Sequence, residues 1–206
     1  MINDHTISYL ALGDSYTIGE AVPAADSFPY QLAARLSAEQ IFVEQPYIIA
    51  TTGWTSSELQ AAIKTAALGT KFDLVTLLIG VNNQYRGESI TVYRQEFAAL
   101  LQTALDLAGG DKSRVFVVSI PDWGATPFGV ASGRGQEAIA LDIDAFNVVN
   151  KEETLRAGVN YTDITPASRA AVSDPELVAE DGLHPSAKMY SDWVNNLLPA
   201  VMKVLK

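Results

Sequence analysis

Apolar runs and segments with helical spacing alternate along the whole chain. The runs predict strands at residues 6–13, 46–53, 72–80, 114–121 and, more weakly, 159–164. The central runs are rich in Val, Ile and Leu without polar residues at every second position. Such continuous apolarity is typical of strands that are buried on both faces of a parallel sheet.

Helical spacing is clearest in residues 55–67, in residues 88–108 and near the C-terminus. At the start of the first segment Thr55 or Ser56 is placed to cap a helix, and Glu58 or a neighbouring residue can complete the capping arrangement. In the other two segments the apolar residues recur on one face: Tyr93, Phe97, Leu100, Leu101 and Leu105, then Tyr190, Trp193, Leu197, Val201 and Val204. We interpret both stripes as core-packing faces and not as cofactor sites.

The alternation predicts a single three-layer α/β/α domain over residues 1–206, with a mostly parallel five-stranded sheet. No repeat or linker interrupts it, and residues 121–137, rich in Gly and Pro, predict one long loop. Ligands of such domains bind beyond the carboxyl ends of the strands. The residues directly after each apolar run are therefore the candidates for chemistry.

Composition narrows the function classes. The net charge of −10 argues against nucleic acid or an anionic membrane surface as the main partner. The absence of cysteine excludes disulfides, thiolate catalysis and cysteine-ligated metals. No apolar run approaches the roughly 20 residues of a transmembrane helix, so we expect no stable membrane insertion. The N-terminus lacks the basic region of a signal peptide, which favours a cytoplasmic location, with a secreted or periplasmic location as the alternative if a leader has been removed. Partner proteins are left open.

Ser15 directly follows the first predicted strand, in the stretch YLALGDSYTIGE at residues 9–20. Gly, Asp and Ser also form ordinary turns, so the motif alone does not decide between a turn and a nucleophile. A serine nucleophile needs a base, usually histidine. The chain has two histidines, of which His5 precedes the first strand near a terminus and is expected to be solvated. His184 is then the base if Ser15 is a nucleophile.

A catalytic histidine also needs an acid that orients it. Asp181 lies three residues before His184 in the stretch DGLH, so one short turn can hold both groups. Asp174 and Glu180 are weaker alternatives. Asp181 as a mere cap or turn residue is an equally open interpretation of this stretch alone.

A developing oxyanion needs hydrogen-bond donors that are already aimed at it. The Ser15 amide, the Gly53 amide after the second predicted strand, and a side-chain amide of Asn82 or Asn83 after the third are the candidates. Gly and Asn also form turns after strands, and the spacing does not choose between the two asparagines. All of these sites nevertheless lie just beyond apolar runs.

The order of GDS, a lone Gly, GVNN and DGLH resembles the SGNH (GDSL) hydrolases, whose fold is flavodoxin-like. The name of that family lists its site residues, which fall here on Ser15, Gly53, Asn82 and His184. The resemblance implies a Ser15 nucleophile, a His184 base oriented by Asp181, and an oxyanion hole that includes Asn82. Asn83 stands where the family often has Asp, and we interpret this position as supporting.

The resemblance implies that a small-molecule carboxylic ester, of short to medium acyl or acetyl type, is cleaved through an acyl-enzyme without metal or cofactor. Thioesters and lysophospholipids remain open as substrates. Aromatic residues near strand ends are candidate pocket walls, or simple packing residues: Trp54, Tyr85, Trp123 and Phe128. The alternative functions are a phosphate- or nucleotide-binding module of flavodoxin type and a non-catalytic domain on the hydrolase scaffold.

Overall fold

A computed structural model describes residues 6–69 and 71–206, and His5 lies outside this range. Its centre is a five-stranded sheet in the order β2-β1-β3-β4-β5, in which every neighbouring pair is parallel. The strands are β1 (Tyr9–Gly13), β2 (Tyr47–Ala50), β3 (Leu74–Leu78), β4 (Val115–Val118) and β5 (Asn160–Thr162). The predicted α/β class with a parallel five-stranded sheet is confirmed.

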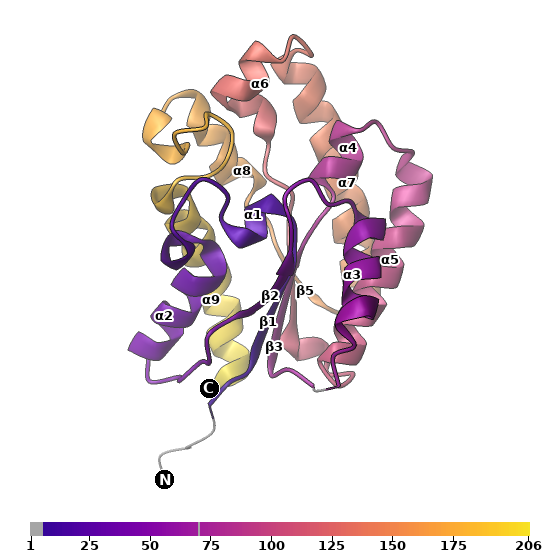
Figure 1. The fold of residues 1–206 in the computed structure, drawn as a ribbon, viewed down its shortest axis with the longest axis vertical. Helices are drawn as coiled ribbons and strands as arrows, with labels where there is room; N and C mark the ends of the chain where they lie inside the picture. Colours follow the sequence, from indigo (N-terminus) through magenta and orange to yellow (C-terminus); the bar gives the residue numbers. More distant parts are fainter. Residues whose placement is uncertain (1–5, 70) are drawn as a thin grey trace.

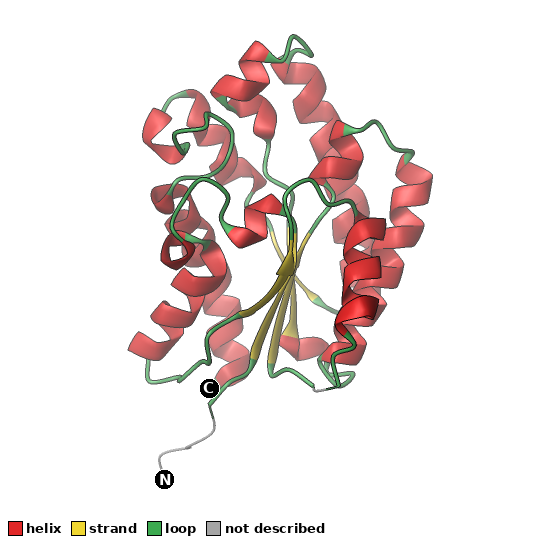
Figure 2. Ribbon diagram, viewed as in Figure 1, coloured by secondary structure: helices red, strands yellow, loops and turns green. Residues whose placement is uncertain are grey.

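Helices cover both faces of the sheet, as Figures 1 and 2 show. The helices α2 (Phe28–Ala38) and α9 (Ala187–Leu205) lie on one face. On the other face lie α3 (Ser56–Ala66), α5 (Ile90–Leu107) and α7 (Gln136–Ala157). Shorter helical segments complete the fold: α1 (Ser15–Ile18), α4 (Val81–Tyr85), α6 (Pro127–Ala131), α8 (Thr165–Ser168), and the 3₁₀ turns η1 (Ala24–Asp26), η2 (Lys112–Arg114), η3 (Trp123–Ala125), η4 (Arg169–Val172) and η5 (Pro175–Leu177).

The ladders are shorter than the apolar runs that predicted them. Ile79 and Ile120 are fully buried although each lies beyond the end of its strand. An apolar run indicates that residues are buried, and it does not indicate that they pair with a neighbouring strand. The predicted strands are therefore too long where the chain leaves the sheet but stays inside the protein. These buried exits carry the chain from β3 and β4 directly into the segments that line the candidate site.

Residues 121–137 do not form one long loop, which corrects the prediction. The segment contains η3 and α6 and reaches the first turn of α7. Thr126 caps α6 by accepting a hydrogen bond from the Gly129 amide, and Pro127 occupies the first helical position, where its missing N–H costs nothing. Pro127 thus begins α6, and Gly135 is the N-cap of α7, so these two residues mark helix ends and not irregular chain.

The helices α2 and α7 escaped the sequence analysis. In α7 the outer face carries apolar side chains that are well exposed, at Leu141, Val148 and Leu155. Because these apolar residues lie on the side of the helix that is normally polar, the segment shows no clear amphipathic periodicity. In α3, by contrast, the expected capping box is present between Thr55 and Glu58.

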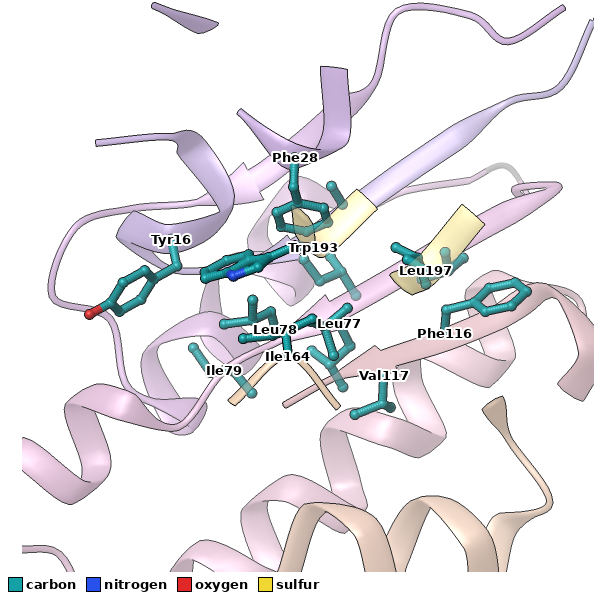
Figure 3. Packing of buried hydrophobic residues seen from close by; sticks show 14 of the residues in the cluster. Tyr16, Phe28, Leu77, Leu78, Ile79, Phe116, Val117, Ile164, Trp193 and Leu197 are labelled. Carbon is teal, nitrogen blue, oxygen red and sulfur yellow. The ribbon is translucent and has the colours of Figure 1, made fainter. Parts of the chain in front are cut away.

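The core connects the outer helices to the short helix that carries Ser15. In Figure 3, Trp193 of α9 lies close to Phe28 and Tyr16. Its ring centroid is 6.4 Å from that of Phe28 and 6.3 Å from that of Tyr16. The predicted stripes on α5 and α9 face the core, and of their members only Val204 is partly buried. Aromatic packing of Tyr16 against Trp193 therefore holds α1 against α9.

Candidate functional site

Ser15 is the first residue of α1, immediately after β1 ends. Asp14 caps this helix, since its Oδ1 accepts from the Tyr16 amide at 3.0 Å. Position 13 needs glycine, because a Cβ there would lie 2.1 Å from the Thr17 hydroxyl. The Ser15 side chain is buried, and its N–H has no protein acceptor within the described ranges. Ser15 thus offers a hydroxyl and a free amide at one point.

Asp14 itself is fully buried, and its Oδ2 has no hydrogen-bond partner among the residues described. Burial raises the pKa of Asp14 to about 7, and the hydrogen bond from the Tyr16 amide opposes this rise only in part. A carboxyl group that is hard to ionise therefore lies directly beside the serine.

His184 and Asp181 form a contact within one turn. The His184 Nδ1 lies 2.5 Å from Asp181 Oδ2. Asp181 Oδ1 accepts from the backbone amides of Leu183 at 2.9 Å and His184 at 3.0 Å. The His184 ring is buried and stacks at a tilt on Tyr16, with centroids 5.3 Å apart. The carboxylate therefore fixes both the turn and the ring.

The electrostatics of Asp181 favour its charged form. Partial burial acts to raise the pKa of this carboxyl group, but the His184 ring and the amides of Leu183 and His184 hold the pKa below its ordinary value. An anion beside Nδ1 stabilises a positively charged imidazole and leaves Nε2 free for a proton. No hydrogen bond joins the Ser15 hydroxyl to the ring within residues 6–69 and 71–206, and such bonds often form only with substrate.

The turn after β2 and the helix α4 meet on the other side of Ser15. The Asn82 Nδ2 donates to the Trp54 carbonyl at 2.9 Å, which leaves its second hydrogen free. The Gly53 backbone has a φ of +86°, and its N–H has no acceptor in the described part of the chain. Arg86 donates to the Gly53 carbonyl at 2.6 Å and pairs with Glu58. Three N–H donors (the Ser15 and Gly53 amides and the Asn82 side chain) are thereby available.

Asn83 of α4 is fully buried and connects α4 with the first residue of α3 and with Glu88. Its Oδ1 accepts from the Ser56 amide at 3.0 Å, and its Nδ2 donates to Ser56 Oγ at 2.7 Å and to Glu88 Oε2 at 2.7 Å. A carboxylate at this position would face Glu88 with like charge. An asparagine therefore suits these neighbours better than an aspartate. Its side chain is used by Ser56 and Glu88, and Asn83 is not among the residues that line the pocket.

Most of the candidate residues surround one pocket of about 220 Å³, and Asp181 supports it from behind His184. Its lining is mainly apolar and comprises Ser15, Tyr16, Thr52, Gly53, Val81, Asn82, Tyr85, Trp123, Phe128, Leu183 and His184. Tyr85, Trp123 and Phe128 form a continuous wall with ring centroids 5.4 to 6.4 Å apart. Trp54 is not among the lining residues, because its side chain packs on the core.

Some functional candidates carried no signal in the sequence. Arg86 and Arg134 hold the walls of the pocket from outside, yet arginines in loops are unremarkable in a pattern of apolar positions. Leu183 and Thr52 line the pocket beside predicted residues and were detectable only as their neighbours. Long-range contacts of this kind become visible only in the folded chain.

Within the described residues there is no cluster of three or more His, Asp or Glu side chains suited to a metal ion. None of the helices described there has the length and apolarity needed to cross a membrane.

Comparison with protein families gives a match to the GDSL-like lipase/acylhydrolase family over residues 11–191. A search of curated proteins gives no match. Among solved structures, a lipase/acylhydrolase from Enterococcus faecalis is similar with a TM-score of 0.76 and 20% identity, covering 98% of both chains. TesA is similar with a TM-score of 0.74 and 19% identity, covering 96% of this chain and 99% of its own.

An acetylxylan esterase from Geobacillus stearothermophilus, Axe2, has a TM-score of 0.72 and 17% identity, covering 100% of this chain and 96% of its own. At these identities the likeness concerns the fold. The family match and the shared fold both agree with the resemblance that the motifs indicated.

Proposed function

The chain belongs to the GDSL-like lipase/acylhydrolase family, and on that premise we propose that it is a serine hydrolase that cleaves carboxylic esters through an acyl-enzyme. One observation carries the proposal. Ser15 and His184 line the same pocket, and His184 is held at its Nδ1 by Asp181 at 2.5 Å. This is the arrangement of nucleophile, base and orienting acid that acyl transfer needs.

In the proposed first step, Ser15 Oγ attacks the ester carbonyl while His184 Nε2 takes the serine proton. The carbonyl oxygen becomes an oxyanion and accepts hydrogen bonds from the Ser15 amide, the Gly53 amide and Asn82 Nδ2. Asp181 stabilises the imidazolium that forms. His184 then gives its proton to the departing alkoxide, and the acyl group stays on Ser15.

In the second step, water replaces the alcohol. His184 takes a proton from the water, whose oxygen attacks the acyl carbonyl, and the same donors hold the second oxyanion. The bond to Ser15 Oγ breaks, the serine regains its proton from His184, and the carboxylic acid leaves. Both proposed steps involve only residues that line the pocket, together with Asp181, which supports His184.

The pocket supports a small ester with a short to medium acyl group. Its volume of about 220 Å³ and its mainly apolar wall suit an acyl chain better than a charged group. The fold shared with an acetylxylan esterase supports acetyl esters at the short end of this range.

The test is hydrolysis of p-nitrophenyl esters from acetate to decanoate by the wild type and by Ser15→Ala. Ser89→Ala is the matched control, because this exposed serine makes no side-chain cap bond and lies outside the pocket. We expect turnover in the wild type and the control and none above background in Ser15→Ala. Equal rates in all three would refute the proposal, and ligand-dependent melting with phosphate would favour the binding-module alternative.

A further inference from the structure

The turn Gly133-Arg134-Gly135, between α6 and α7, returns toward the pocket. Both glycines have positive φ angles, +72° and +84°, and both have open space where a Cβ would be. Residues with a side chain rarely adopt this conformation, so the glycines serve the backbone path and not close packing. That path places the guanidinium of Arg134 over the outer face of the aromatic wall.

Arg134 makes three contacts with this wall. Its guanidinium carbon lies 4.3 Å from the centre of the Tyr85 ring and 5.7 Å from that of Trp123. Its Nη1 also donates to the Tyr85 carbonyl at 2.8 Å. A cation over aromatic faces is attracted by the ring quadrupoles, and the carbonyl hydrogen bond fixes the backbone beneath.

The two rings differ in how the rest of the protein holds them. Trp123 is buried, and its Nε1 donates to Gln84 at 2.8 Å. Tyr85 is 39% exposed, and its hydroxyl has no hydrogen bond in the described part of the chain. Arg134 is thus the polar group that fixes Tyr85 against Trp123.

Arg134 also lacks the ion pairs that occupy other arginines near the site. Arg86 pairs with Glu58, and Arg169 pairs with Asp122. No carboxylate among residues 6–69 and 71–206 lies within ion-pair distance of Arg134. Among the described residues the Arg134 side chain contacts only the wall, although the chain has a net charge of −10 and so offers many acids.

We propose that Arg134 is a positioning residue for specificity: it holds Tyr85 in the wall so that the pocket binds the apolar part of an ester. The proposal rests on the proposed function and adds which esters the site prefers, namely those whose chain or ring reaches Tyr85. We expect an octanoyl group on Ser15 to gain more from this wall than an acetyl group, because the longer chain has more apolar surface to bury against the rings.

The first experiment compares p-nitrophenyl octanoate with p-nitrophenyl acetate in the wild type, Arg134→Ala and Arg134→Lys. We expect Arg134→Ala to lower kcat/KM for octanoate roughly threefold to tenfold, mainly through KM, with acetate nearly unchanged. Arg134→Lys keeps the charge but not the planar fork, so it rescues part of the loss. Arg156→Ala, at the far end of α7 and exposed, is the control.

A second series keeps the acetyl group and compares methyl acetate with octyl acetate. It is needed because the apolar part of the natural ester can be either its acyl chain or its alcohol. A selective loss in one of the two series supports the proposal. Unchanged selectivity in both series would overturn it.

A double-mutant cycle with Tyr85→Ala tests the route of action. We expect Arg134→Ala to have no further effect on octanoate selectivity once the Tyr85 ring is gone, and full additivity would contradict the proposal. Binding of octanamide, followed by NMR in Ser15→Ala, gives a readout without turnover. Weaker octanamide binding in the double variant Arg134→Ala Ser15→Ala than in Ser15→Ala supports the positioning role of Arg134 even if the serine mechanism fails. Equal binding in the two proteins refutes that role.

Discussion

The two sides of the pocket are built in different ways. The proposed acid–base side is local, because Asp181 and His184 lie in one turn and their side chains meet three residues apart. The proposed oxyanion side is assembled from segments that are distant in sequence, since Asn82 reaches the Trp54 carbonyl across 28 positions and Arg86 reaches the Gly53 carbonyl across 33. One side depends on a single turn, and the other on contacts between loops.

This difference predicts how each side tolerates change. A local turn keeps its geometry as long as its own hydrogen bonds persist, and here the Asp181 carboxylate supplies them. On the assembled side, the Gly53 and Asn82 donors are positioned by hydrogen bonds to other segments. We expect loss of any of these bonds to displace the donors. Substitution of His184, which leaves the Asp181 carboxylate in place, should therefore damage chemistry alone, whereas substitutions on the assembled side should also affect stability.

The largest expected effect is that of His184→Ala. We expect kcat to fall by about 10⁴-fold or more, because the nucleophile loses its base and the leaving group loses its acid. Initial rates with p-nitrophenyl acetate measure this loss. Circular dichroism should show a folded protein, and a variant that keeps more than a tenth of the rate would point to a different base.

Asn82→Ala comes next and probes the assembled side. We expect kcat to fall by about 10²–10³-fold with a smaller change in KM, because the lost donor acts on charge that develops only in the transition state. Steady-state kinetics over a full substrate range separate the two constants. A rise in KM with kcat intact would mean that Asn82 binds the ground state instead.

Asn83→Ala should affect stability more than chemistry. The change leaves the Ser56 amide without its buried acceptor, a loss of about 1–3 kcal/mol. For a protein of this size that corresponds to a drop in Tm of roughly 2–4 °C per kcal/mol. Differential scanning calorimetry measures the drop. A stable variant with an Asn82-like loss of kcat would show that Asn83, and not Asn82, faces the oxyanion.

The last prediction concerns the pH dependence of stability, through Asp14. The folded state holds the Asp14 proton up to a pKa of about 7, whereas the ordinary value is 3.8, so the folded state binds more protons between these values. The free energy of unfolding therefore falls as pH rises from about 4 to 7. Asp14→Asn should flatten this slope, which melting curves from pH 4 to 8 will show. An unchanged slope would mean that Asp14 is ionised throughout.

The same contrast explains what the sequence revealed. The Asp181–His184 pair was visible because a three-residue spacing in a glycine-containing turn is local information. The parallel sheet was visible because the buried runs are continuously apolar. Arg86 and Arg134 were not, because their partners are a backbone carbonyl and aromatic rings in other loops. The sequence also could not choose between Asn82 and Asn83. That choice depends on which of the two side chains is already hydrogen-bonded to Ser56 and Glu88, and in the fold it is Asn83.

The most direct test of the serine mechanism is covalent labelling with a fluorophosphonate, followed by peptide mass spectrometry. We predict one label per chain, located on Ser15, with labelling lost in Ser15→Ala and strongly slowed in His184→Ala because the base no longer activates the hydroxyl. Labelling of another residue, or of Ser15 at the same rate without His184, would contradict the mechanism that the pocket geometry supports.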